Sequence, residues 1–246
     1  MKNILLANNL DFHGEKNQLI KRILEDINTN ELSRLFTDRT YELTDLGKEV
    51  IEKEKHIAYI HRNNIEGLDI WFLNEQVQKH PGYYYKNIVW EYLHNQSLKC
   101  YKKSDLEMYR NYRLAMAKFL EEDGSDTALS YYVEVARLDL SGLSNGFSMK
   151  YLEKYVDNYF PYSRSSAKIS KEVLEKIKKH KLENVLSDEE LKNRVYNLKG
   201  RLNLPFSLFT VEQVAEIIIM EIHGDTKGLD QLYAEVRNNF NFETSG

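Results

Sequence analysis

Four residues near the start of the chain, Gly14, Lys16, Lys21 and Arg22, have the types and spacing of a phosphate-binding corner. Gly14 lies where the chain is expected to turn from an extended segment into a helix, and a residue without Cβ allows a positive φ or a close backbone approach there. Lys16 falls in or near the first turn of that helix, where uncapped N–H groups and the helix dipole already favour an anion. The chemistry that these residues predict is the binding of phosphate.

The three cations cannot all face one phosphate. At about 100° per residue, Lys21 lies roughly 140° around the helix from Lys16, and Arg22 lies roughly 120° around it in the other direction. A DNA backbone that crosses the start of the helix can still meet Lys16 and one of the other two. Such contacts hold a protein in position on DNA without reading its bases.

An apolar pattern indicates the two helices that must position this corner. Leu19, Ile20 and Ile23 are three to four residues apart and form one helical stripe. We expect this stripe to pack against three leucines of a short preceding helix, namely Leu5, Leu6 and Leu10. The predicted structure is a helical hairpin.

The segment from Leu5 to Ile23 resembles the SAP domain, a module of helix, extended segment and helix that binds DNA. The residues that match its pattern are Leu10, Gly14, Lys16, Leu19, Ile20, Arg22 and Ile23. The copy is shortened to residues 2–27, as in bacterial and phage proteins with a SAP domain, because the family's first helix normally begins before the position of Met1. The resemblance implies weak, backbone-directed DNA binding. The alternative is a helical cap with solvated charges, since residues 1–40 carry six basic and six acidic side chains.

A second basic surface is predicted over residues 164–181, which hold seven basic and two acidic side chains. Apolar residues at helical spacing favour an amphipathic helix whose outer side meets phosphate or an acidic partner. The alternative is a plain solvated face. The candidate residues of this surface are Lys168, Lys171, Lys178 and Lys179.

The middle of the chain resembles a single tetratricopeptide-like helix pair at residues 109–142. The matching positions, which combine large, small and aromatic packing residues, are Tyr112, Ala115, Phe119, Ala128, Tyr132 and Val135. Met116 departs from the family's small residue, and no Pro ends the second helix. The resemblance implies a competing function, a protein-interaction scaffold without DNA binding, which a groove lined by Tyr and Asn would favour. Solenoids need about three repeats, so the alternative is two core helices joined by a turn.

No constellation of catalytic residues stands out. His56 and His61 are five residues apart, outside the spacing of helical metal ligands, and Cys100 is the only cysteine. Gly142 and Gly146 lack the third Gly and the Lys of a phosphate loop. We therefore expect a non-enzymatic protein without a metal or a cofactor.

Helices should dominate the fold, because only 3 Pro and 11 Gly occur in 246 residues. Three N-cap hydroxyls precede apolar stretches with a Glu or Gln three residues later, at Ser104 with Glu107, Ser187 with Glu190 and Thr210 with Gln213. Alternating apolar and polar residues predict a small β-ribbon of Thr40–Thr44 and His56–His61, on either side of a helix over Asp45–Lys55. The sequence thus predicts a mainly α protein: an N-terminal helical hairpin with a ribbon, followed by a multi-helix bundle.

Helix-breaking residues at Pro81–Gly82 and Phe160–Pro161 divide the chain into three parts. These are an N-terminal unit, residues 1–80, a helical middle, 81–160, and a C-terminal helical part, 161–246. The net charge of −4 excludes a protein whose whole surface attracts nucleic acid. The absence of a long apolar run and the single cysteine favour a cytoplasmic protein without a membrane partner. The partners expected are DNA, a protein partner or a second copy of the chain.

Overall fold

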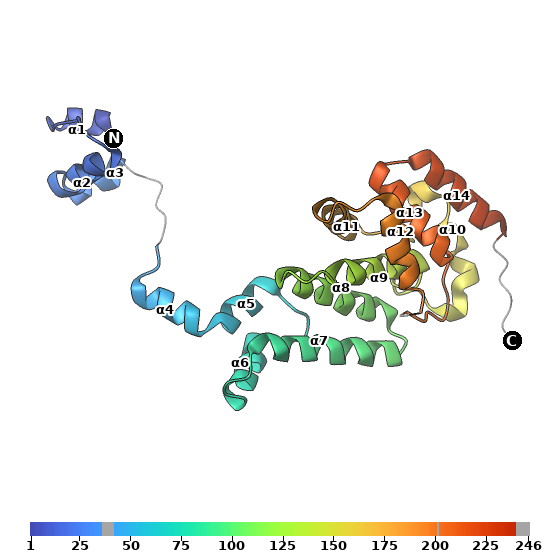
Figure 1. Ribbon diagram of the computed structural model, residues 1–246. Helices are drawn as coiled ribbons and strands as arrows, with labels where there is room; N and C mark the ends of the chain where they lie inside the picture. The colour runs from blue at the N-terminus through green and yellow to red at the C-terminus, as the bar shows by residue number, and fades with distance from the viewer. Residues whose placement is uncertain (36–41, 201, 240–246) are drawn as a thin grey trace. The chain divides into compact units, whose positions relative to one another are not determined.

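The computed structural model describes residues 1–35, 42–200 and 202–239. Within these residues the chain is all-helical, with fourteen α-helices, two short 3-10 helices and no strand (Figure 1). The prediction of a mainly α protein is confirmed. The chain divides into two compact units, unit 1 (Met1–Lys55) and unit 2 (His56–Gly246), whereas divisions near residues 80 and 160 stay predictions.

Unit 1 is a small helical hairpin followed by two further helices. Its core consists of four buried residues, Leu5, Leu19, Ile23 and Ile27, through which α1 packs on α2. Leu6 and Ile20, expected in this core, are exposed instead, because two short helices can cover only one narrow side of each other. The helices are α1 (Lys2–Ala7), α2 (Lys16–Asp26), α3 (Thr29–Leu35) and α4 (Asp45–Lys53).

The predicted β-ribbon is wrong. His56–His61 belongs to the helix α5 (Lys55–Asn63), in which His56, Tyr59 and Ile60 are buried. Tyr59 and Ile60 lie three and four residues after His56, so the burial follows a helical period and not the alternation of a strand. Glu42–Thr44 is not in a strand either, and residues 40 and 41 lie outside the described residues. Thr44 instead caps α4, accepting a hydrogen bond from the Gly47 N–H at 3.1 Å, and α4 ends at Lys53 rather than at residue 55.

Unit 2 contains the remaining helices, and several begin at a side-chain cap. The two capping boxes Ser187–Glu190 and Thr210–Gln213 are confirmed. Ser104 is not an N-cap, because Asp105 accepts the Met108 N–H in its place. After α5 come α6 (Ile70–Lys79), α7 (Tyr85–Lys102), α8 (Leu106–Glu122), α9 (Ala128–Ser141), η1 (Met149–Tyr155), α10 (Val156–Tyr159), η2 (Tyr162–Arg164), α11 (Lys171–Glu183), α12 (Asp188–Asn197), α13 (Val211–His223) and α14 (Thr226–Asn239).

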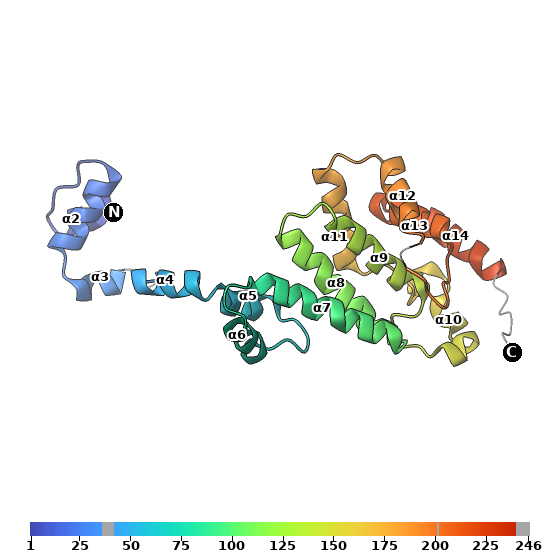
Figure 2. The same ribbon diagram turned by 60° about the horizontal axis from the view of Figure 1, so that its bottom comes forward.

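Helix α8 joins the two hydrophobic cores of unit 2. Figures 1 and 2 show α7, α8 and α9 side by side, and α8 packs on both neighbours. One face of α8 contributes Tyr112, Met116 and Phe119 to a core with α5, α6 and α7. Another face contributes to the larger core around α9 and α11–α14. The two helices expected within residues 109–142 are therefore central packing elements.

A partly buried carboxylate ties α8 to α9 and α11. Glu121 accepts hydrogen bonds from Tyr132 at 2.6 Å, from Lys176 at 2.7 Å and from Lys179 at 2.9 Å. Burial opposes the charge of Glu121, but the three donors together outweigh burial and lower its pKa to about 2. The charge is therefore a structural link among three helices.

Candidate functional site

The corner at Gly14 has the backbone geometry that the sequence predicts. Gly14 has a φ of +129°, which L side chains rarely adopt. A Cβ at this position would stand 2.6 Å from Oε1 of Gln18. That oxygen accepts a hydrogen bond from the Glu15 N–H at 3.0 Å, so the Gln18 side chain folds back over the entrance to α2. The positive φ is what favours glycine here, since the close contact is with the far end of a flexible side chain.

Arg22 holds the extended segment that leads into the corner. Its guanidinium donates to the carbonyl of Asp11 and, at 3.1 Å, to the carbonyl of His13, and it lies 3.5 Å from the Asp11 carboxylate. The His13 backbone N–H also donates to Asp11 and is the main cause that lowers the pKa of that carboxyl, with Arg22 as a smaller cause. The structure therefore gives Arg22 a positioning role within unit 1.

Lys16 and Lys21 are the exposed cations of this surface. Lys16 is the first residue of α2, where backbone N–H groups lack helical partners, and it forms no ion pair within the described residues. Lys21 lies 3.7 Å from Glu25, an exposed pair of the kind that contributes little. Contact of Gly14, Lys16, Lys21 or Arg22 with DNA stays a prediction.

The four lysines of the second basic surface differ in their surroundings. Lys168 donates to the Ser163 carbonyl at 3.1 Å and lies 4.1 Å from the centre of the Tyr162 ring. Lys179 is bound to Glu121. Lys171 and Lys178, seven residues apart on the same side of α11, have no ion-pair partner in the part of the chain that the structure describes. These two cations are the ones left to meet an external anion.

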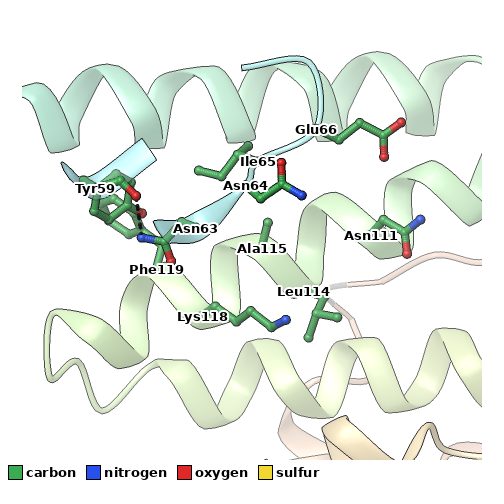
Figure 3. Close-up of a pocket in the computed structure, with 10 residues that line it drawn as sticks. All are labelled: Tyr59, Asn63, Asn64, Ile65, Glu66, Asn111, Leu114, Ala115, Lys118 and Phe119. Atoms are coloured by element: carbon green, nitrogen blue, oxygen red, sulfur yellow. Dashed lines mark hydrogen bonds between the residues drawn. The ribbon is translucent and has the colours of Figure 1, made fainter. Parts of the chain in front are cut away.

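Unit 2 also contains a groove between the end of α5, the turn that follows it, and α8. Figure 3 shows Asn64 and Ile65 of this turn facing Ala115 of α8. The groove has a volume of about 250 Å³. Asparagine amides, tyrosine and phenylalanine rings, small aliphatic groups and two opposite charges line it: Tyr59, Asn63, Asn64, Ile65, Glu66, Asn111, Leu114, Ala115, Lys118 and Phe119.

The turn that forms one wall of the groove is fixed by two tyrosines. The hydroxyls of Tyr92 and Tyr112 donate to the Glu66 carbonyl at 3.2 and 3.4 Å. Burial is the main cause that raises the pKa of Tyr112 to about 12, so this donor keeps its proton at neutral pH. Gly67 follows with a φ of +71°, and a Cβ there would stand 2.5 Å from the Tyr92 hydroxyl.

The sequence did not single out the asparagines of this groove. Asn63 and Asn64 are separated from Asn111 by more than forty residues, and no spacing rule connects them. The pattern at Ala115 and Phe119 predicted packing, and both line the groove. A groove with Tyr and Asn in its lining is present, and its residues could be named only from the structure.

Two further findings concern residues 1–35, 42–200 and 202–239. No group of three or more His, Cys, Asp or Glu is arranged there to hold a metal ion. No helix in those ranges combines the length and apolar character that a bilayer span requires.

Comparison of the chain with family models, with curated proteins and with solved structures finds no match.

Proposed function

We propose that the chain is a non-enzymatic, DNA-associated protein whose unit 1 contacts the sugar–phosphate backbone weakly, as the resemblance to the SAP domain implies. The observation that carries the proposal is Lys16, an exposed cation without an ion-pair partner in the described residues, in the first turn of α2 directly after the Gly14 corner. The N–H groups of residues 16 and 17, the helix dipole and the ammonium group then act on the same phosphate, in competition with the Glu15 carboxylate that caps α2 in a box with Gln18.

The surroundings of the corner support this assignment. Helix α1, the extended segment over residues 10–15 and helix α2 follow one another in the order of the SAP pattern. Arg22 anchors the extended segment through two carbonyls, so the corner keeps its position when a phosphate arrives. Lys21 provides a contact to a different phosphate, because it lies on another side of the helix.

The affinity should be low and strongly dependent on salt. Asp11 and Glu15 lie close to the corner in sequence, and residues 1–40 carry no net charge. Attraction therefore comes from local contacts with two or three phosphates, each of which releases counterions. Lys171 and Lys178 of unit 2 provide a second contact in this proposal.

Fluorescence anisotropy of a labelled duplex DNA, titrated with the full chain at 25 and 200 mM NaCl, tests the proposal. We expect Lys16→Ala with Lys21→Ala to weaken binding at low salt about tenfold and to reduce the salt slope by about 2. The matched control is Lys99→Ala with Lys102→Ala, two exposed lysines on α7 that should leave binding unchanged. Absence of binding at low salt, or equal binding by the two double variants, would refute the proposal.

A second function, a protein-interaction scaffold with tetratricopeptide-like helices, is favoured by the groove between α5 and α8. Its lining combines Tyr59 with three asparagines, which offer an aromatic ring and amide groups to a peptide. In this function unit 1 is a structural cap. Peptide binding by a chain that does not bind DNA would favour it over the first proposal.

A further inference from the structure

The groove presents hydrogen-bonding groups that the protein itself does not use. Asn63 donates from Nδ2 to the Tyr59 carbonyl at 3.1 Å, which leaves its Oδ1 available. Asn111 accepts at Oδ1 from Arg110 at 3.4 Å, which leaves its Nδ2 available. The side chain of Asn64 has no hydrogen-bond partner within the described residues. The groove therefore offers both donors and acceptors.

The charge of the groove separates the candidate ligands. Lys118 and Glu66 are the only charged residues among those that line it, and their charges cancel. Lys118 is in addition paired with Glu172 at 2.5 Å. A polyanion such as nucleic acid gains no net attraction from this lining. A neutral main chain, with one N–H and one C=O at each residue, matches the leftover amide groups.

The volume of the groove fits a single side chain of a bound partner. The volume of about 250 Å³ is smaller than the roughly 300–1,000 Å³ of most small-molecule pockets. The half-buried Ala115 forms part of the floor, with Leu114 and Phe119 beside it. A longer residue at position 115 would fill this space.

One wall of the groove is held in place before any ligand arrives. The Glu66 carbonyl is held by two tyrosine hydroxyls, and Gly67 packs directly against one of them. A wall that does not need to become ordered on binding lowers the entropic cost of association.

We propose that this groove binds an extended peptide segment through its main chain, with Asn63, Asn64 and Asn111 as hydrogen-bonding partners and an apolar side chain seated over Ala115. The inference rests on the second function, the interaction scaffold, and is independent of the DNA contact. Recognition of main-chain groups makes the site tolerant of peptide sequence, while the apolar floor sets one preferred position.

The test begins with a display library of random dodecapeptides selected on the full chain, followed by anisotropy measurements with the most enriched peptide after labelling. We expect Asn64→Gly with Asn111→Ala to weaken binding about tenfold, as loss of two hydrogen bonds implies, and glycine keeps the positive φ of +43° at position 64. Ala115→Phe, which fills the groove, should abolish binding. Asn193→Ala, an exposed asparagine on α12, is the matched control and should change nothing.

The same peptide, N-methylated at its central residues, tests whether the groove binds the main-chain N–H groups of the peptide. We expect N-methylation to weaken binding about tenfold. Equal affinity of both peptides, or of wild type and the double asparagine variant, would overturn the proposal but leave a scaffold function standing. If no peptide is enriched over the Ala115→Phe protein, the peptide proposal and the scaffold function are both overturned. Displacement of the peptide by a single-stranded oligonucleotide would overturn both as well. Thermal unfolding checks the fold of each variant, and the exposed Asn64 and Asn111 keep the test valid if Ala115→Phe does not fold.

Discussion

Replacement of Glu121 by Gln should destabilise unit 2 in a manner that depends on pH. The side chain of Glu121 is 14% exposed and connects α8 with Tyr132 of α9 and with Lys176 and Lys179 of α11. Glutamine has nearly the same shape but no charge, so it keeps the packing and loses the charge-assisted hydrogen bonds.

The pKa of Glu121 gives the size of the effect. Its folded-state pKa is about 2, against a usual value of 4.5. At about 1.4 kcal/mol per pKa unit this difference corresponds to roughly 3 kcal/mol. Lys179 is half-exposed, so solvent screening reduces the expected loss of unfolding free energy to about 1–2 kcal/mol at pH 7.

The sign of the pH dependence follows from the lowered pKa. The stabilisation is fully present above the unfolded pKa of 4.5 and is lost as the pH falls towards 2. Urea unfolding followed by circular dichroism at pH 7 and at pH 3.5 should show a difference between wild type and Glu121→Gln that falls to about half at the lower pH. The exposed neighbour Glu122→Gln is the control and should stay within about 0.5 kcal/mol of wild type. An equal loss for Glu121→Gln at both pH values would refute the reasoning.

Two further predictions concern residues with positive φ. Val185 has a φ of +51° and is 87% exposed, so Val185→Gly should raise the unfolding free energy by about 0.5–1 kcal/mol in urea titrations; no change or a decrease would contradict the assigned strain. Gly142 has a φ of +78°, and a Cβ there would stand 2.8 Å from the buried Tyr159 ring, so Gly142→Ala should cost about 2–4 kcal/mol. Gly124→Ala, with a similar φ but open space, should cost only about 1 kcal/mol, and equal losses for the two would show that the contact with Tyr159 has no effect.

Local signals in the sequence predicted much of the fold. The capping boxes at Ser187 and Thr210 were identified because each depends on a few neighbouring residues. The prediction of a ribbon was wrong because six residues that alternate between apolar and polar also fit a helix. Only tertiary packing shows which of these positions are buried. Ser104 was misplaced as a cap by one residue, since Asp105 offers an equally good acceptor.

The candidate sites were less predictable because they depend on contacts between distant residues. The pattern placed Arg22 among the DNA contacts, but it gave no sign that the Asp11 and His13 carbonyls occupy this side chain. No spacing in the sequence singled out Glu121, because the lysines that bind it lie more than fifty residues away. The asparagines of the groove come from α5, its following turn and α8, and only the packing of these elements brings them together.

The most direct test of the DNA contact is the amide spectrum of the isotope-labelled full chain, recorded by nuclear magnetic resonance during titration with a short duplex DNA at low salt. The account predicts that the amide signals of residues 14–17 shift as DNA is added and return when the salt concentration is raised. Signals of these residues that stay in place while the duplex binds elsewhere, or an unchanged spectrum, would contradict it.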